Sequence, residues 1–169
     1  AQGGALTLTD LAEHESVWTE PIGIGVRDWT VHEMPPNGQG LAALIALGIL
    51  DILQVDRFAA DSAQAVHYQV EAMKAAFSQV HAHVADPRAM TTPAEDFLAP
   101  EFLDQLARSI DPDRAARPVS RIPSSGGTVY LTAADEQGRM VSLIQSNYTG
   151  FGSGVVVGGT GISLQNRGA

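Results

Sequence analysis

The stretch that decides the fold is residues 124–135, SSGGTVYLTAAD. Two serines and two glycines lead into Thr128, where a β-strand is predicted because apolar and hydroxyl-bearing side chains alternate between two faces. Residues 136–138 then form the pattern of a three-residue hairpin loop with Gly138 in the left-handed conformation. A second β-type run, residues 139–145, indicates the returning strand.

The length of this loop fixes which residues face each other across the hairpin. A three-residue loop pairs Asp135 with Arg139, and stepping back along both strands sets Ser146 opposite Thr128. Two hydroxyl groups are therefore expected at the open end of the hairpin. One of them belongs to the first residue after a Gly-Gly pair.

The sequence from Gly126 onward, GGTVYLTAADEQGRMVSLIQSNYTGFGSGVVVGGTGISLQNRGA, resembles the start of the small subunit of the gamma-glutamyltransferase (gamma-glutamyltranspeptidase) family. Members of this family are N-terminal nucleophile hydrolases. Four upstream segments, GGALTLTDLA, MPPNGQG, HYQVEAMKAAF and ADP, are similar to the late part of the large subunit and occur in the family's order. The resemblance covers essentially the whole chain. It implies a fragment that spans the end of the large subunit and the start of the small one.

The resemblance also implies a nucleophile. In the family, the precursor cuts itself immediately before the Thr that opens a Thr-x-x-x-x-x-x-Asp strand, and this spacing runs here from Thr128 to Asp135. A Thr hydroxyl needs an adjacent base, and the α-amino group freed by cleavage, with a pKa of about 8, can serve. Before cleavage, the hydroxyl would attack the carbonyl of Gly127 and form an ester that water opens. From spacing alone, the alternative is an ordinary strand Thr after a glycine turn.

Three further positions are implied to line the substrate site. Ser146 stands where many family members carry a Thr that bonds the nucleophile or its amine, and it keeps the hydroxyl. Tyr148 stands where they hold the substrate α-amino group with a carboxamide or carboxylate, but a phenol cannot pair with a cation as a carboxylate does. Arg167 replaces a Gln or similar residue and favours a carboxylate, bidentately. In the alternative interpretation, Tyr148 packs and Arg167 faces water.

The implied activity is that of a gamma-glutamyltransferase-like amidohydrolase or acyltransferase. It would cleave γ-glutamyl amides of the glutathione type through an acyl-enzyme on Thr128, with water or an amino acid as acceptor. Two alternatives stay open: an acylase of other dicarboxylic acyl amides, of the cephalosporin-acylase type, and a non-catalytic fragment that never matures. The family's oxyanion-hole glycines are expected beyond Ala169 and its carboxylate-binding arginine before Ala1. The isolated fragment is therefore expected to be weakly active or inactive.

The expected fold class is α+β, a partial αββα sandwich of the N-terminal nucleophile hydrolase type. Residues 1–127 would form the C-terminal part of the large-subunit region, with helices, a β-hairpin and a linker at 113–127. Residues 128–169 would form the start of the small-subunit region, with the Thr128 hairpin and a glycine-rich loop. The full-length protein would be a heterodimer of large and small subunits, and the fragment could form homo-oligomers through faces left uncovered.

Upstream of Thr128 the sequence predicts a hairpin within residues 21–34 and four helices. The first begins at Thr9 as N-cap and ends near Ser16. Residues 41–53 are apolar nearly all round and predict a buried helix. The helix after them begins with a capping box whose N-cap is Asp61, and the last begins at Pro100. The third carries an apolar stripe of Val66, Val70, Met73, Phe77, Val80 and Val84; the last carries one of Phe102, Leu103, Leu106 and Ile110.

Composition bounds the remaining functions. The chain has 169 residues, no cysteine and a formal charge of −9, which argues against nucleic acid as a partner. No apolar run reaches the length of a membrane span, and no cofactor is expected. No signal peptide is recognisable, so the periplasm and the cytoplasm both remain open. The histidines and the acid at 67, 71, 81 and 83 lack a metal-ligand spacing, so no metal is expected. His67 is instead expected to pair with Glu71, one helical turn away.

Overall fold

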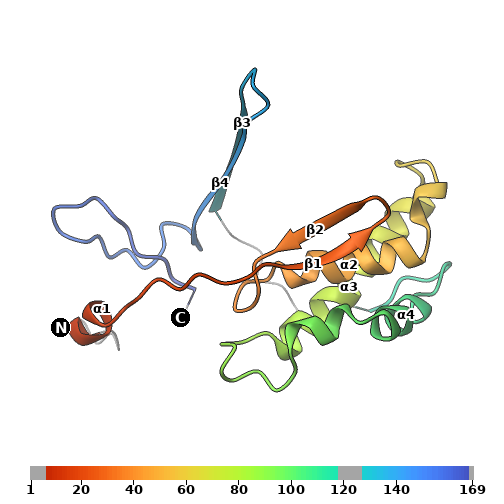
Figure 1. Cartoon of the computed structure of the whole chain (residues 1–169), viewed down its shortest axis with the longest axis horizontal. Helices are drawn as coiled ribbons and strands as arrows, with labels where there is room; N and C mark the ends of the chain where they lie inside the picture. The colour runs from red at the N-terminus through yellow and green to blue at the C-terminus, as the bar shows by residue number, and fades with distance from the viewer. Residues whose placement is uncertain (1–6, 118–126, 168–169) are drawn as a thin grey trace. The chain divides into compact units, whose positions relative to one another are not determined.

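A computed structural model of the chain describes residues 7–117 and 127–167 (Figure 1). Helices and antiparallel hairpins occur together, so the fold is α+β as predicted. The chain divides into two compact units, Ala1–Ser120 and Arg121–Ala169.

The first unit contains most of the regular structure. In chain order its elements are α1 (Leu8–Ala12), β1 (Ile22–Val26), β2 (Trp29–Glu33), α2 (Leu41–Ile52), the 3₁₀ turn η1 (Val55–Arg57), α3 (Ala63–His83), the 3₁₀ turn η2 (Ala94–Leu98) and α4 (Pro100–Arg108). The antiparallel pairing of β1 with β2 confirms the hairpin predicted within 21–34.

Helix α2 is the centre of the first unit, as its apolar sequence predicts. It packs against β1, α3 and α4, and four of its large side chains are fully buried: Leu41, Leu44, Ile45 and Ile49. Gly48 lets two neighbours approach this helix closely. A Cβ atom there would lie 2.7 Å from Cδ1 of both Ile24 in β1 and Leu103 in α4. A helical glycine, normally unfavourable by about 1 kcal/mol, is thus explained by close packing.

Helix α3 corrects two expectations. Its N-cap is Ser62, whose Oγ accepts a hydrogen bond from Ala65 N at 3.2 Å, so the assignment of Asp61 was off by one residue. The large side chains at the start of the expected stripe also face outward, with Val66 48% and Val70 50% exposed. The second half of the stripe is confirmed, because Val80 is buried and Phe77 and Val84 pack against the core. The other buried residues of α3 are Ala65, Glu71, Ala72 and Ala76. Small side chains such as Ala65 and Ala72 let α3 approach α2 closely. A prediction from apolar spacing selects their larger neighbours, Val66 and Met73, instead.

The ends of the short first helix also differ from the prediction. Helix α1 ends at Ala12 rather than near Ser16, and its N-cap is Thr7 rather than Thr9. The Thr7 side chain accepts from Asp10 N at 3.2 Å, and the Asp10 carboxylate accepts from Thr7 N at 2.7 Å. This reciprocal capping box satisfies two backbone donors, which a cap at Thr9 would not do here.

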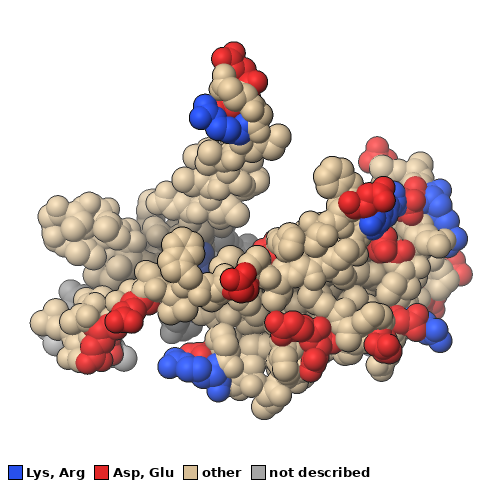
Figure 2. All heavy atoms as spheres, in the orientation of Figure 1, with Lys and Arg blue, Asp and Glu red and all other residues tan. Residues whose placement is uncertain are grey.

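The second unit is built on the hairpin of β3 (Gly127–Ala134) and β4 (Met140–Tyr148). Its register is the predicted one, with Thr128 opposite Ser146 and Ala134 opposite Met140. Gly138 has φ 77°, the left-handed conformation expected for the loop. Figure 2 shows the stem of this hairpin as uncharged surface, with acidic and basic side chains gathered at its tip.

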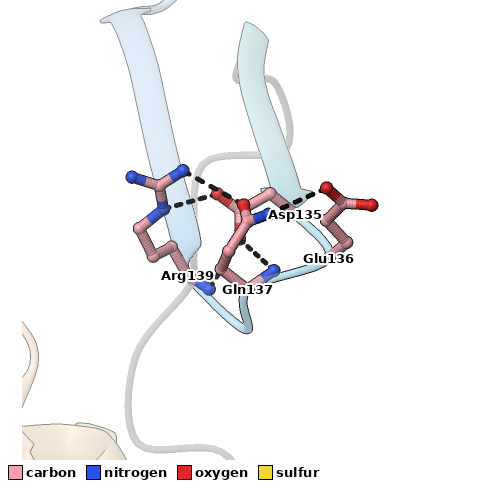
Figure 3. A network of polar contacts seen from close by, with 4 residues as sticks. All are labelled: Asp135, Glu136, Gln137 and Arg139. Carbon is pink, nitrogen blue, oxygen red and sulfur yellow. Dashed lines mark hydrogen bonds and ion pairs between the residues drawn. The ribbon is translucent and has the colours of Figure 1, made fainter.

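Asp135, the last residue of the Thr-x-x-x-x-x-x-Asp spacing, holds the hairpin tip together (Figure 3). Its Oδ1 accepts from the backbone N–H groups of Gln137 and Arg139 at 3.0 and 2.9 Å, and Oδ2 accepts from Arg139 Nε at 2.5 Å. The pKa of Asp135 is lowered, chiefly by the Arg139 N–H, against an opposing effect of desolvation. This carboxylate therefore shapes the turn at the end of the hairpin opposite Thr128.

The glycine-rich segment after β4 is an irregular loop. Within this loop, Val156 and Ser163 form an isolated antiparallel bridge. Hydrogen bonds flank the bridge, from Val157 N to Ile162 O at 2.8 Å and from Leu164 N to Val155 O at 2.9 Å. Within the described ranges, no helix is both long and apolar enough to cross a bilayer.

Candidate functional site

Thr128 and Ser146 meet at the open end of the β3–β4 hairpin. They lie opposite each other in the register, and the Thr128 hydroxyl donates to Ser146 Oγ at 3.2 Å. Thr128 is exposed and Ser146 half-buried within the described structure. The arrangement keeps a Thr hydroxyl oriented by a neighbouring hydroxyl and accessible from outside.

The hairpin ladder is irregular at this pair. The register shifts between Gly127 and Thr128, so that Gly127 pairs with Tyr148 while Thr128 pairs with Ser146. Asn147 is therefore the extra residue of a β-bulge, a feature that re-aims side chains and is enriched beside active sites. The bulge lies at the peptide bond that the sequence predicts to be cut.

Tyr148 takes an unusual backbone conformation at the bulge. Its φ is 76°, in the left-handed region that residues other than glycine rarely adopt. Its N–H donates to Ser146 Oγ at 2.9 Å, so the oxygen that contacts Thr128 also accepts a backbone hydrogen bond. Strain of this kind, of order 1–3 kcal/mol, is characteristic of functional sites.

Arg167 contacts both Ser146 and Tyr148, although it lies about 20 residues after them in the sequence. Its guanidinium carbon lies 5.7 Å from the centre of the Tyr148 ring, and its Nη1 donates to the Ser146 carbonyl at 3.3 Å. The structure thus brings together Thr128 and the three residues predicted to line the substrate site, Ser146, Tyr148 and Arg167, while Gly127 of the predicted cleavage bond pairs with Tyr148. In the alternative interpretation Tyr148 packs and Arg167 faces water; here the Tyr148 ring contacts Arg167, and Arg167 is exposed, so the geometry is compatible with both interpretations.

The charge at this site is positive. Arg167 is not among the residues that form ion pairs in the described part of the chain. Their basic partners are Lys74 and four arginines: Arg27, Arg88, Arg108 and Arg139. Arg167 instead contacts a ring and a carbonyl oxygen, and a guanidinium carries five N–H donors in a planar fork. Such a group is suited to a carboxylate.

Asn166 is the residue that sequence reasoning missed. Its Oδ1 accepts from Thr149 N at 3.0 Å, and its Nδ2 donates to the carbonyls of Thr149 and Gly152, both at 3.2 Å. An Asn in a loop is a signal for side-chain-to-backbone bonding, but the partners of Asn166 lie 14 and 17 residues away. Sequence spacing therefore could not identify them.

The first unit holds a separate polar cluster in which the expected pairing of His67 with Glu71 is not the one formed. His67 Nε2 lies 2.8 Å from the Asp111 carbonyl, whereas Glu71 bonds Lys74 Nζ at 2.7 Å and Ala116 N at 3.0 Å. Burial by itself would raise the pKa of Glu71, but the hydrogen bonds from Lys74 and Ala116 outweigh it and lower the pKa. Among the residues described, no group of three His, Asp or Glu side chains could hold a metal ion.

Part of the expected cleavage region falls outside the structure. Ser124, Ser125, Gly126 and most of the expected linker lie outside the described residues. The linker's first residues, 113–117, are described, and they include Ala116, whose backbone meets Glu71 and Lys74 on α3.

Comparison with known proteins identifies one family and several related proenzymes. The family described as gamma-glutamyltranspeptidase matches residues 1–169. The chain is 43% identical to an oxamate amidohydrolase proenzyme of Klebsiella pneumoniae over 169 residues, which is 100% of this chain and 31% of that protein. It is 36% identical to the glutathione hydrolase-like YwrD proenzyme of Bacillus subtilis over 167 residues, 99% of this chain and 31% of that protein.

A solved structure shows the same fold. A crystal structure described as cephalosporin acylase from Bacillus halodurans matches with a TM-score of 0.79 and 46% identity, over 98% of this chain and 30% of that one. The chain therefore spans about a third of the length of the relatives it matches.

Proposed function

The chain belongs to the gamma-glutamyltranspeptidase family, and we propose that it carries the nucleophile of an N-terminal threonine amidohydrolase. The single observation that supports this most is the contact of Thr128 with Ser146 at the bulge. Relatives across the chain's full length are named as amidohydrolase and glutathione hydrolase-like proenzymes. The term proenzyme fits a nucleophile that must first be released from a peptide bond.

The first proposed step is self-cleavage. Thr128 Oγ attacks the carbonyl carbon of Gly127, the peptide C–N bond breaks, and the nitrogen takes a proton to become the α-amine of Thr128. Water then hydrolyses the resulting ester, which leaves a carboxylate on Gly127 and restores the Thr128 hydroxyl. Ser146 Oγ, 3.2 Å from the Thr128 oxygen, orients that oxygen for the attack.

The second proposed step is amide hydrolysis. The free α-amine of Thr128 takes the hydroxyl proton as Oγ attacks the substrate carbonyl, and the leaving amine departs with a proton. An acyl ester on Thr128 remains, and water hydrolyses it to release the acid. An amino acid in place of water would make the same ester a transferase intermediate.

For the acyl group, we propose a dicarboxylic acid held through its free carboxylate. Arg167, supported by the Tyr148 ring, supplies a cationic fork next to the Thr128–Ser146 pair. A γ-glutamyl head group also carries an ammonium, which a guanidinium repels and which a phenol cannot neutralise. Oxamate, the substrate in one relative's name, is the monoamide of a dicarboxylic acid, and a similar structure is described as cephalosporin acylase.

Cleavage of γ-glutamyl amides is the second candidate. The 36% identity to a glutathione hydrolase-like proenzyme favours it. In that case the substrate ammonium would have to find its partner outside residues 128–169. A non-catalytic fragment that stays uncut is the third candidate; it predicts that the full-length protein keeps a single uncut mass.

The subunit arrangement is part of the same proposal. Residues 1–127 would be the end of a large subunit and residues 128–169 the start of a small one, joined as a heterodimer after cleavage. The β3–β4 hairpin exposes apolar side chains on both faces, as expected of strands at the centre of a layered αββα sandwich.

Substrate class can be tested by steady-state kinetics on the full-length processed protein. Succinamate and L-glutamine are compared as substrates of the wild type and of Arg167→Gln, with ammonia release as the readout. We expect the wild type to prefer succinamate, and the variant to lose roughly 10- to 100-fold in kcat/KM for it, because a charge-assisted hydrogen bond is removed. A wild type that prefers glutamine, or an Arg167→Gln variant with unchanged preference, would support the γ-glutamyl candidate instead.

A further inference from the structure

We propose that Asn166 is a positioning residue that sets the carboxylate selectivity of this site by holding Arg167 beside Ser146 and Tyr148. The inference rests on the proposed function and extends it to a residue that does not touch the reacting atoms. It starts from the hydrogen bonds of one half-buried carboxamide.

The Asn166 side chain fastens two chain segments together. Its oxygen accepts from Thr149 N, and its nitrogen donates to the carbonyls of Thr149 and Gly152. The Asn166 backbone N–H adds a fourth bond, to the carbonyl of the bulge residue Asn147 at 3.2 Å. Asn166 is thus attached at four points to residues 147–152, immediately after Ser146.

These four hydrogen bonds fix the position of the Arg167 backbone. The Arg167 side chain is long and flexible, and ordering such a chain costs up to about 2 kcal/mol. Because the preceding residue is fixed to the end of β4, the Arg167 backbone is already placed when its guanidinium meets the Tyr148 ring and the Ser146 carbonyl. A preorganised cation binds a carboxylate better than one that must be ordered on binding.

The turn that contains the hydrogen-bond partners of Asn166 requires glycine at position 152. Gly152 has φ 78°, and a Cβ atom there would lie 2.5 Å from the Leu164 carbonyl oxygen. The Gly152 N–H donates to Thr149 O at 3.0 Å, and Ser153 N donates to Leu164 O at 2.9 Å. The substitution Gly152→Ala therefore displaces the same contact between segments without removing the carboxamide.

The chemistry requires an amide rather than an acid. An Asn side chain accepts with its oxygen and donates with its nitrogen, and Asn166 does both. In Asn166→Asp the acceptor for Thr149 N remains, but both donations are lost and a carboxylate faces two carbonyl oxygens. That carboxylate would also compete with substrate for the neighbouring Arg167.

The test compares two substrates that differ only in the group Arg167 is proposed to bind. Succinamate carries a carboxylate at the end of its chain, and butanamide has a methyl group there. Selectivity is the ratio of their kcat/KM values, measured on the full-length processed protein for the wild type, Asn166→Ala, Asn166→Asp, Arg167→Gln and the double variant Asn166→Ala/Arg167→Gln. Asn37→Ala, in an exposed loop of the first unit, is the matched control.

We expect Asn166→Ala to reduce selectivity roughly tenfold, mainly through KM for succinamate, and Asn166→Asp to reduce it at least as much. In the double variant, the loss should be no greater than in Arg167→Gln alone, because Asn166 acts through Arg167. Gly152→Ala should reproduce the selectivity loss, and Asn37→Ala should leave selectivity at the wild-type value.

Three outcomes would overturn the inference: unchanged selectivity in both Asn166 variants, an equal loss for the two substrates, or a loss in the double variant that adds to that of Arg167→Gln. Failure of the proposed function gives a different pattern, in which the wild type and Arg167→Gln already treat succinamate and butanamide alike. If Asn166→Ala does not fold, Asn166→Asp and Gly152→Ala give the same comparison.

Discussion

The two units of the chain are stabilised in different ways. In the first, α2 is enclosed by its neighbours, and the hydrophobic core formed by the described residues lies between Ile22 and Ala107. In the second, none of the described residues from Thr128 to Arg167 is buried. The hairpin is held by its backbone ladder and by polar contacts at both ends, from Asp135 at the tip and Asn166 at the base.

The difference indicates which parts of the chain need partners. Apolar side chains are exposed on both faces of the hairpin, with Val129 and Leu131 on one and Tyr130 and Ile144 on the other. An isolated two-stranded hairpin is marginally stable in water, and strands apolar on both faces are normally covered on both. We therefore expect substitutions in the first unit to change global stability and those in the second to act locally.

The largest effect is expected for Ile45→Ala in α2. Ile45 is fully buried, and truncating such a side chain costs about 2–5 kcal/mol of unfolding free energy. Val66→Ala on the outer face of α3 is the matched control and should cost less than about 1 kcal/mol. Urea denaturation of the chain followed by circular dichroism measures both, and equal effects would contradict the packing described for α3.

The next effect concerns the buried carboxylate of Glu71, which is 3% exposed. Its pKa in the folded chain lies below the ordinary value of 4.5, so ionisation stabilises the fold above that pH, and this contribution is lost as pH falls through the folded pKa. Glu71→Gln should destabilise the first unit by about 1–3 kcal/mol at pH 7, and its stability should depend less on pH as the pH falls below 4.5.

The exposed carboxylate of Asp86 provides the control for that experiment. Hydrogen bonds from the Arg88 side chain and backbone lower its pKa to about 2, but the pair is open to solvent. Asp86→Asn should leave the urea midpoint at pH 7 close to that of the wild type. A loss as large as that of Glu71→Gln would show that burial does not distinguish the two carboxylates.

The smallest effect is expected at the hairpin tip, for Gly138→Ala. Gly138 has φ 77° and nothing near the position of an added Cβ, so the cost is that of a left-handed alanine, about 1 kcal/mol. Gly158→Ala is the matched control, because its surroundings are equally open and its φ lies outside the left-handed region. Amide hydrogen exchange across β3 and β4 should speed up for Gly138→Ala and not for Gly158→Ala.

The sequence predictions were accurate where the interacting residues are joined by a short loop, and failed where tertiary packing brings together distant residues. The register of Thr128 with Ser146 was predictable because it depends on one short loop and strict alternation. The buried face of α3 was predictable only in its second half, at Phe77, Val80 and Val84. The small buried residues Ala65, Ala72 and Ala76 could not be predicted, because their burial depends on how closely α2 approaches. Asn166 was missed for the same reason, since its partners are set by the path of a glycine-rich loop.

The prediction of the four site residues combined local sequence spacing with resemblance to a family. Spacing and register predicted the contact between Thr128 and Ser146, whereas the inclusion of Tyr148 and Arg167 came from resemblance to a family. The structure joins them through contacts that no local rule contains, namely a left-handed Tyr148 and a guanidinium over its ring.

The most direct test of the account is the intact mass of the full-length protein, measured fresh and after days at neutral pH, beside its Thr128→Ala variant. We predict two fragments that divide between Gly127 and Thr128, with Thr128 as a new N-terminus, and a single uncut mass for the variant. A wild type that stays uncut, or one that is cut at another bond, would contradict the assignment of Thr128 as nucleophile.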